Sequence, residues 1–257
     1  MGGMSGSAPP ADAAYDVLDA YFGDLITRYV RGDLSRSDAI AGIIGPVEAD
    51  PAAARAAAES LGGPLWAVWD RVVHAATDGD DTARDRLVAL LVGVRDRDAA
   101  TRDGGLRWAE LPLLGAVMRE AWNWGSPPDG DRQTWVNLNA FAARLTAVGI
   151  DCSTYAVWTL RAALEEPGDP DQLAAAVAWF RHCGPVLRNA CEASTVPGRP
   201  PTVRPGRLAV EGGVTGDGFT LARWRFWHRR WETLASSGGP HAETARNALV
   251  LMDDAGR

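Results

Sequence analysis

The segment that most constrains the fold is 134–148, which has apolar side chains on nearly every side of a helix. A helix of that composition is usually buried, because a surface helix carries polar residues on its outer face. Apolar residues also recur at helical spacing after Pro112, and a turn-rich break at 125–130 separates the two patterns. The stretch 108–145 therefore predicts a central helical pair around which other helices pack.

The rest of the chain has the same helical character. Apolar residues form one stripe of an amphipathic helix over 13–29, and similar patterns recur to the end of the chain. No segment alternates apolar and polar residues with the β-branched bias and hairpin turns of strands. The sequence therefore predicts an all-α protein, and its eleven tryptophans against four tyrosines indicate an aromatic-rich core. We expect a single multi-helix domain of about nine or ten mostly antiparallel helices with a tryptophan-rich core.

The predicted domain organisation is simple. Residues 1–11 are expected to form a disordered tail, and residues 12–257 one helical domain. Proline, glycine and arginine are concentrated in the segment 194–217, which shows no helical pattern. A stretch of this length without regular structure is usually a lid, a binding loop or a disordered segment. We therefore expect a long loop or lid at 194–217.

Composition narrows the possible environment and partners. A net charge of −7 argues against binding to nucleic acid or to an anionic membrane. No apolar run is long enough to span a bilayer, and the amino terminus does not resemble a secretory signal. The three widely spaced cysteines fit reduced thiols better than a disulfide framework. The sequence thus predicts a cytoplasmic protein, and it leaves the oligomeric state open.

Motifs for metals and cofactors are not found in the sequence. It contains no dinucleotide-binding glycine pattern, no Walker motif, no HExxH, no CxxC pair and no EF-hand loop. His182 and Cys183 are adjacent, and neighbouring residues on a helix do not face each other, so a core cysteine is favoured over a thiol nucleophile. We expect neither a metal nor a cofactor.

A helix rich in tryptophan and arginine, at about 219–234, is the best candidate for a ligand-binding element. A helical wheel places Arg223 and Arg230 inside an aromatic face with Trp227, and Arg225 and Arg229 outside it. Two guanidinium groups among aromatic rings can clamp a carboxylate or phosphate. The alternative is that both arginines pair with internal acidic residues and stack on tryptophan as structural contacts.

The central stretch offers the remaining candidates. Trp135, Asn137 and Asn139 combine an aromatic face with polar groups that could bond a ligand carbonyl, and the alternative is that the amides bond neighbouring protein groups. Glu120 is the candidate catalytic residue, because an apolar pocket raises the pKa of a carboxylic acid and suits it to proton transfer. A salt bridge from Glu120 to an arginine such as Arg144 is the alternative.

Four segments of the chain read WAELPLLGAVMREAWN, WVNLNAFAARL, YAVWTLRAALE and FTLARWRFWHRRWETLA, the last followed by ETARNALVLM. Together they resemble a family of uncharacterised proteins from filamentous ascomycete fungi, defined by a domain of unknown function with tryptophan-rich helical signatures. The resemblance covers about residues 13–253. It implies an intracellular helical protein that sometimes accompanies fungal natural-product pathways. It implies no accepted reaction and no catalytic residue.

Two functions remain in competition at this point. The first is a helical protein that binds a small, anionic organic molecule, and that could act as a cofactor-independent cyclase, isomerase or lyase of fungal natural-product metabolism. In that case an Arg230→Ala variant should lose ligand binding while its melting temperature stays largely intact. The second is a non-catalytic protein–protein interaction domain, in which the tryptophans serve stability and the segment 194–217 binds a partner.

Overall fold

All regular secondary structure in the part of the chain that the structure describes is helical, which confirms the predicted all-α class. The computed structural model describes residues 11–49, 63–97, 107–125, 131–167, 171–198 and 202–257. Within these ranges there are eleven α-helices and no β-strand, one helix more than the upper end of the prediction. The predicted disordered tail lies outside the described residues except for Ala11, which begins the first helix.

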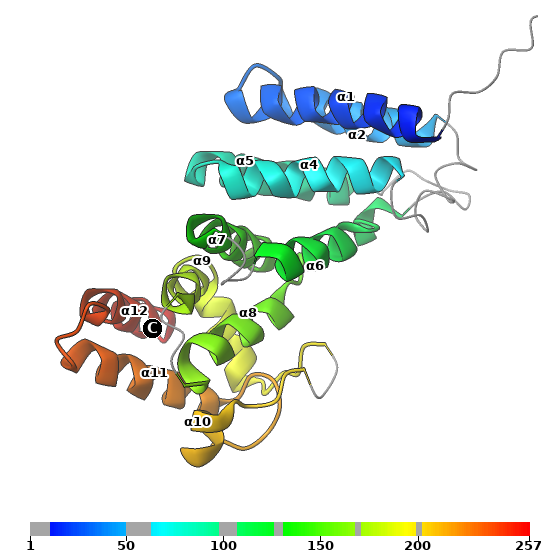
Figure 1. Ribbon diagram of the computed structural model, residues 1–257. Coiled ribbons are helices and arrows are strands. Elements are labelled where there is room, and N and C mark those ends of the chain that lie inside the picture. The colour runs from blue at the N-terminus through cyan, green and yellow to red at the C-terminus, as the bar shows by residue number, and fades with distance from the viewer. Residues whose placement is uncertain (1–10, 50–62, 98–106, 126–130, 168–170, 199–201) are drawn as a thin grey trace, which may run out of the picture. The chain divides into compact units, whose positions relative to one another are not determined.

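The chain divides into two compact units, residues 1–124 and 125–257, which are described separately (Figure 1). The prediction of a single domain stays a prediction. The first unit contains α1 (Ala11–Arg31), α2 (Arg36–Glu48), α4 (Pro64–Asp78), α5 (Asp81–Arg95), a 3-10 turn η2 (Trp108–Glu110) and α6 (Leu114–Gly125), which ends at the boundary.

Packing of α1 on α4 forms much of the first unit (Figure 1). Local sequence signals set the helix starts: the Ser35 hydroxyl accepts from the Asp38 amide before α2, and the Asp80 carboxylate accepts from the Ala83 amide before α5. Trp69 is fully buried on α4 and donates from its indole nitrogen to the Pro112 carbonyl oxygen at 2.7 Å. This bond ties the segment before α6 to the core of the unit.

The second unit holds the tryptophan-rich part of the chain. Its elements are α7 (Arg132–Ala147), α8 (Ser153–Leu160), the π-helical turn η3 (Arg161–Glu165), α9 (Gln172–Glu192), α10 (Arg207–Glu211), α11 (Leu221–Ser236) and α12 (Ala242–Ala255). Helix α7 is buried at Trp135 and at every position of 137–146, as its all-round apolar composition predicted. Helix α9 packs against it, and α11 packs against α12 (Figure 1).

Helix α9 runs through Gly184 and Pro185 as one helix of 21 residues, although a proline inside a helix usually breaks or kinks it. The side chain of Pro185 is exposed, so its ring points away from the packed face. A Cβ atom added at Gly184 would lie 3.1 Å from the Cβ atom of Ala255. The glycine therefore permits the close approach of α12 to α9.

The segment 194–217 has more regular structure than expected. Gly206 precedes the short helix α10, and Val203, Ala209 and Val214 are buried. The amide of Gly218 also donates to the Val203 carbonyl oxygen at 3.0 Å. The described part of this segment is thus anchored to its own unit by apolar side chains and backbone hydrogen bonds, and its role as a lid stays a prediction.

None of the helices in the described ranges is both long and apolar enough to cross a membrane.

Candidate functional site

Asn139 is the centre of a buried polar network on α7. Its amide nitrogen donates to the Trp135 carbonyl oxygen at 2.9 Å, and its amide oxygen accepts from the Thr159 hydroxyl at 2.7 Å and the Trp179 indole at 2.8 Å. The Trp135 indole in turn donates to the Gln172 side chain at 2.8 Å. Asn139 is fully buried. The network joins α7, α8 and α9 through buried side chains whose hydrogen-bond donors and acceptors pair with one another.

Asn137 lies between Trp135 and Asn139 on α7, two residues from each, and is also buried. Its side-chain oxygen accepts from the Gln133 side chain at 2.9 Å. The three central candidates Trp135, Asn137 and Asn139 therefore bond protein groups, as the structural alternative expects. Their assignment to ligand binding stays a prediction.

A second buried network is built around Glu165, which sequence analysis did not single out. The carboxylate accepts from Nε and a terminal nitrogen of Arg223 at 2.5 and 2.9 Å, and from the Trp227 indole at 2.6 Å. The Gly206 amide adds a fourth bond at 2.7 Å. Glu165, Arg223 and Trp227 are all fully buried.

The remaining donors of Arg223 bind backbone oxygens of the segment before α11. One terminal nitrogen donates to Val203 and Gly218 at 2.9 and 2.8 Å, and the other also donates to Arg204 at 3.3 Å. The guanidinium lies 5.7 Å from the centre of the Trp227 ring. Arg223 thus joins α11, η3 and the segment 203–218, and no donor faces solvent.

Glu165 reaches this position from the π-helical turn η3. The wider turn places Glu165 inward, while Glu166 bonds Arg161 at the protein surface. Single π-helical turns often occur at functional sites. Here the turn orients a structural carboxylate, and no sequence signal marked it, because Glu165 and Arg223 are 58 residues apart.

Arg230, the other predicted clamp residue, has a separate partner. It is half-buried on α11 and donates from Nε to the Leu164 carbonyl oxygen at 3.2 Å. Arg223 and Arg230 therefore bond η3 at different atoms. The ion pair between Arg223 and Glu165 is the kind of structural contact that the sequence offered as the alternative to a ligand clamp. The ligand-binding role of Arg223, Trp227 and Arg230 stays a prediction.

Glu120, the catalytic candidate, lies on α6 in the first unit, whereas the six ligand-binding candidates lie in the second. Its side chain is exposed, although sequence analysis expected it to border an apolar pocket. The exposure follows from its position next to Arg119, also exposed, on the polar face of an amphipathic helix. Its role in proton transfer stays a prediction.

An open hollow of about 370 Å³ lies on the surface of the second unit, between α9 and α11. It is lined by Arg188 of α9 and by Trp224, Arg225, His228, Arg229 and Glu232 of α11. The hollow contains three arginines and a histidine against one carboxylate.

The cations of this hollow differ in their partners. Arg188 lies 5.6 Å from the centre of the Trp224 ring and pairs with Glu192 at 2.9 Å. His228 lies 3.2 Å from Asp253. Arg225 and Arg229 are exposed, and neither side chain has an ion pair or hydrogen bond to another residue in the described ranges. They are the two guanidinium groups at this hollow that remain open to a ligand.

The helical wheel correctly oriented α11. Arg223 and Trp227 are buried, and Arg225, Arg229 and Glu232 are exposed, as their spacing predicted. The hollow itself could not be inferred, because Arg188 belongs to another helix. The available signal was the spacing of Arg225 and Arg229, which are one turn apart with the same charge.

The cysteines are not suited to nucleophilic chemistry. All three are buried and unpaired by disulfides. Burial raises the pKa of Cys152, Cys183 and Cys191 to about 12. Because the thiolate is the reactive form, these thiols are unreactive near neutral pH, and the preference for Cys183 as a core residue is confirmed.

These features define an all-helical protein with buried polar networks and a basic surface hollow in its second unit. The chain belongs to the protein family of unknown function DUF3632, whose model matches residues 69–231. The expected membership of an uncharacterised family is thereby confirmed. Glu165, Arg223 and the hollow arginines all lie in the matched range. No curated protein and no solved structure matches the chain.

Proposed function

We propose that the protein binds a small organic anion in the hollow between α9 and α11. The observation that carries this proposal is the pair Arg225 and Arg229, exposed one turn apart without an acidic partner in the described ranges, beside Arg188 of the neighbouring helix. The proposal keeps the predicted ligand class, a small organic anion. It moves the contact from the inward arginines of α11 to the outward ones.

Electrostatics favours an anion at this position. Like charges four residues apart on a helix destabilise it by about 0.2–0.5 kcal/mol, because their Cβ atoms are only about 5–6 Å apart. A carboxylate or phosphate between Arg225 and Arg229 would replace this repulsion with charge-assisted hydrogen bonds. The planar guanidinium group matches both anions in a bidentate geometry.

Trp224 supports an organic ligand over an inorganic ion. Its ring packs edge-on against Phe180, with ring centres 5.7 Å apart, and this contact holds it beside the hollow. Trp224 is only 5% exposed, so it offers an edge and not a broad stacking surface. A small aromatic or alicyclic group attached to the anion would contact this edge and the stem of Arg188.

The test is a titration of the protein with phenyl phosphate and with benzoate, in which isothermal titration calorimetry at low ionic strength measures binding. We expect saturable binding that weakens at least about tenfold in the double variant Arg225→Gln/Arg229→Gln, because charged hydrogen bonds contribute roughly 1.5–3 kcal/mol each. The matched control is Arg246→Gln, an exposed arginine of α12 outside the hollow. Equal weakening in the control, or no saturable binding, would reject the proposal.

The catalytic extension of this proposal is a cofactor-independent cyclase, isomerase or lyase of fungal natural-product metabolism. It needs a proton-transfer group at the ligand; Glu120, the predicted candidate, lies in the first unit and does not line this hollow. Product analysis after incubation of polyketide and terpenoid acids with the protein tests it. Product that accumulates equally with wild type and a Glu120→Gln variant would remove Glu120 from the mechanism.

The competing proposal is a non-catalytic protein–protein interaction domain. The exposed large apolar residues in the described ranges are few and come from several elements; in the second unit they are Val148, Val186, Val196, Val210 and Val250. Scattered apolar residues of this kind are ordinary on a protein surface. Analytical ultracentrifugation together with a pull-down from native lysate distinguishes the two proposals, because a stable complex with a partner would favour the interaction domain.

A further inference from the structure

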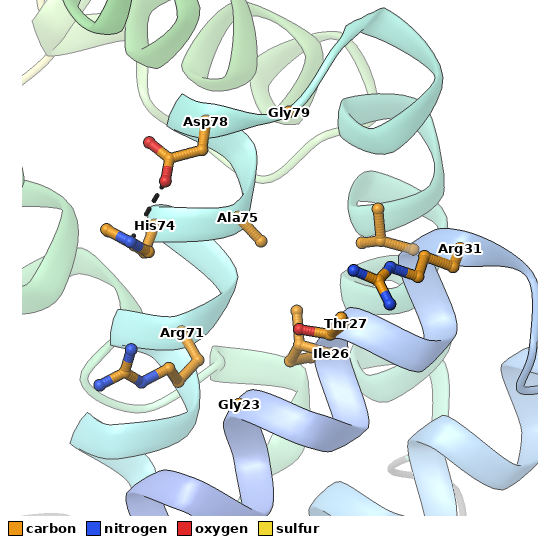
Figure 2. Close-up of a pocket in the computed structure, with 10 residues that line it drawn as sticks. Gly23, Ile26, Thr27, Arg31, Arg71, His74, Ala75, Asp78 and Gly79 are labelled. Atoms are coloured by element: carbon orange, nitrogen blue, oxygen red, sulfur yellow. Dashed lines mark ion pairs between the residues drawn. The ribbon is translucent and has the colours of Figure 1, made fainter.

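A second hollow, of about 310 Å³, lies in the first unit between α1 and α4 (Figure 2). It is separate from the hollow of the proposed function, with which it shares no residue. It is lined by five residues of α1, by four residues of α4 and by Gly79, which follows the end of α4.

Small and apolar side chains form the middle of this hollow. Ile26 and Ala75 face the gap between the helices in Figure 2, and Gly23 leaves space beside them. A Cβ atom added at Gly23 would meet only the Arg71 side chain, at an ordinary contact distance of 3.7 Å. The space over Gly23 is therefore open and can receive an aliphatic group.

Some polar side chains at the edge of the hollow are already paired with other residues, and others could bind a ligand. Arg71 binds both carboxylate oxygens of Asp19, at 2.6 and 2.5 Å, and His74 pairs with Asp78 at 3.2 Å (Figure 2). Arg31 and Thr27 have no side-chain hydrogen bond or ion pair to any residue of the described part of the chain. On the α1 side, a cation and a hydroxyl group thus remain available.

The unpaired cation of the hollow lies in a unit that is acidic as a whole. Residues 1–124 contain 12 arginines against 19 acidic residues and account for the whole net charge of −7. In the hollow, Asp19 balances the charge of Arg71 and Asp78 lies against His74, so Arg31 supplies the positive charge that has no acidic partner in the described residues. An unpaired cation in an acidic unit favours an anionic ligand at this place.

We propose that the hollow between α1 and α4 binds a short-chain aliphatic monocarboxylate. The carboxylate accepts from the Arg31 guanidinium and the Thr27 hydroxyl, and the alkyl chain lies over Gly23, Ile26 and Ala75. Ligand pockets commonly combine an apolar surface with a few polar groups that fix orientation. The volume of the hollow suits a ligand at the small end of that range.

The experiment is a titration of the full chain with hexanoate, and hexanamide serves as the uncharged counterpart. Isothermal titration calorimetry measures the affinity, and backbone NMR shifts of α1 and α4 locate the binding site. We expect saturable hexanoate binding with shifts confined to these helices. Hexanamide and the Arg31→Ala variant should each bind at least about tenfold more weakly. The control variant is Arg28→Ala, on the same helix, whose side chain pairs with Asp24 outside the hollow.

A steric variant tests the apolar part independently. Gly23→Leu should fill the hollow and abolish binding, whereas Gly115→Leu, at an exposed helix position with nothing within 4 Å of an added Cβ atom, should not. Circular dichroism of both variants checks that the helices remain. If Gly23→Leu does not fold, the comparison of Arg31→Ala with Arg28→Ala still decides the proposal.

Three outcomes would overturn the inference. These are no saturable hexanoate binding, equal weakening by Arg28→Ala, and equal affinity for hexanamide. A loss of hexanoate binding in the Arg225→Gln/Arg229→Gln variant would also reject it, because that result assigns the ligand to the second unit. Conversely, failure of phenyl phosphate at the α9–α11 hollow with retained hexanoate binding would reject only the proposed function.

Discussion

Glu165 accepts hydrogen bonds from the side chains of Arg223 and Trp227 and from the Gly206 amide. The side chains of Glu165, Arg223 and Trp227 are all shielded from solvent. Burying an ion pair costs desolvation energy, so such a pair adds little stability compared with a packed apolar pair. Removal of one partner is different, because it leaves the other charge buried without compensation. This asymmetry makes Glu165 and Arg223 sensitive positions of the second unit.

We therefore predict that Glu165→Gln lowers the free energy of unfolding by about 3–5 kcal/mol. The double variant Glu165→Leu/Arg223→Met should recover part of that loss, since it removes both charges. Urea unfolding followed by circular dichroism measures the effect. Arg207→Gln, which breaks an exposed pair with Glu211, should leave the midpoint unchanged. A Glu165→Gln midpoint equal to wild type would contradict this account of the network.

The three buried thiols make stability depend on pH. Their pKa is raised to about 12 in the folded protein, mainly by burial, against roughly 8.5 for an unfolded cysteine. Below a pH of about 8.5 the three thiols are protonated in both the folded and the unfolded protein, so their contribution to stability is fully present. As pH rises from there toward 12, the unfolded state loses protons first, and stability falls.

We predict that the urea midpoint of wild type decreases between pH 8 and pH 10, and that Cys183→Ala shows a shallower decrease. Each thiol can contribute up to about 1.4 kcal/mol per pH unit in this window. The comparison of slopes removes the effect of other groups, such as tyrosines, that titrate in both proteins. Parallel slopes would show that Cys183 does not contribute to the pH dependence.

Among the helices, α11 carries arginines on both its buried face and its exposed face. Arg223 serves the buried network, and Arg225 and Arg229 face the hollow between α9 and α11. The periodicity of the sequence predicted these two orientations, because the direction of a side chain on a helix depends only on its position along the chain. The continuity of α9 through Pro185 and the π-helical form of η3 were not predicted, because both depend on packing against other elements.

The arginines of α11 lead to a prediction that couples stability to binding. Arg225→Glu replaces a repulsive pair with an attractive one in the favourable order, acid before base. The free energy of unfolding should rise by roughly 0.5 kcal/mol in low salt, while the affinity for phenyl phosphate falls. Arg246→Glu on α12 is the control. A destabilised Arg225→Glu variant would mean that Arg225 already has a favourable partner.

At the scale of the whole molecule, the tryptophans are mainly core residues. Ten of the eleven have described side chains; Trp66 and Trp158 are half-buried, and the other eight are buried. Their indole nitrogens frequently bond partners distant in sequence, as Trp179 does with Asn139 and Trp108 with Glu48 at 3.0 Å. These contacts account for the abundance of tryptophan without requiring a ligand.

We therefore predict that iodide quenches only a small fraction of the native tryptophan fluorescence, and most of it after unfolding in urea. Buried indoles are inaccessible to a hydrated anion. An anionic ligand in the α9–α11 hollow should alter the fluorescence only slightly, through Trp224. Stern–Volmer plots of the native and unfolded protein measure the difference. Similar slopes in both states would show that the tryptophans are accessible.

Helical periodicity is a local property of the chain, so it was enough to predict the all-α class, the burial of α7 and the inward and outward faces of α11. The pairing of Arg223 with Glu165, the hydrogen bonds from Thr159 and Trp179 to Asn139, and the position of Arg188 beside Arg225 and Arg229 depend on how the helices pack. Each of these contacts joins residues from different helices. Local periodicity identifies which side chains are turned inward, but long-range packing decides which groups they meet.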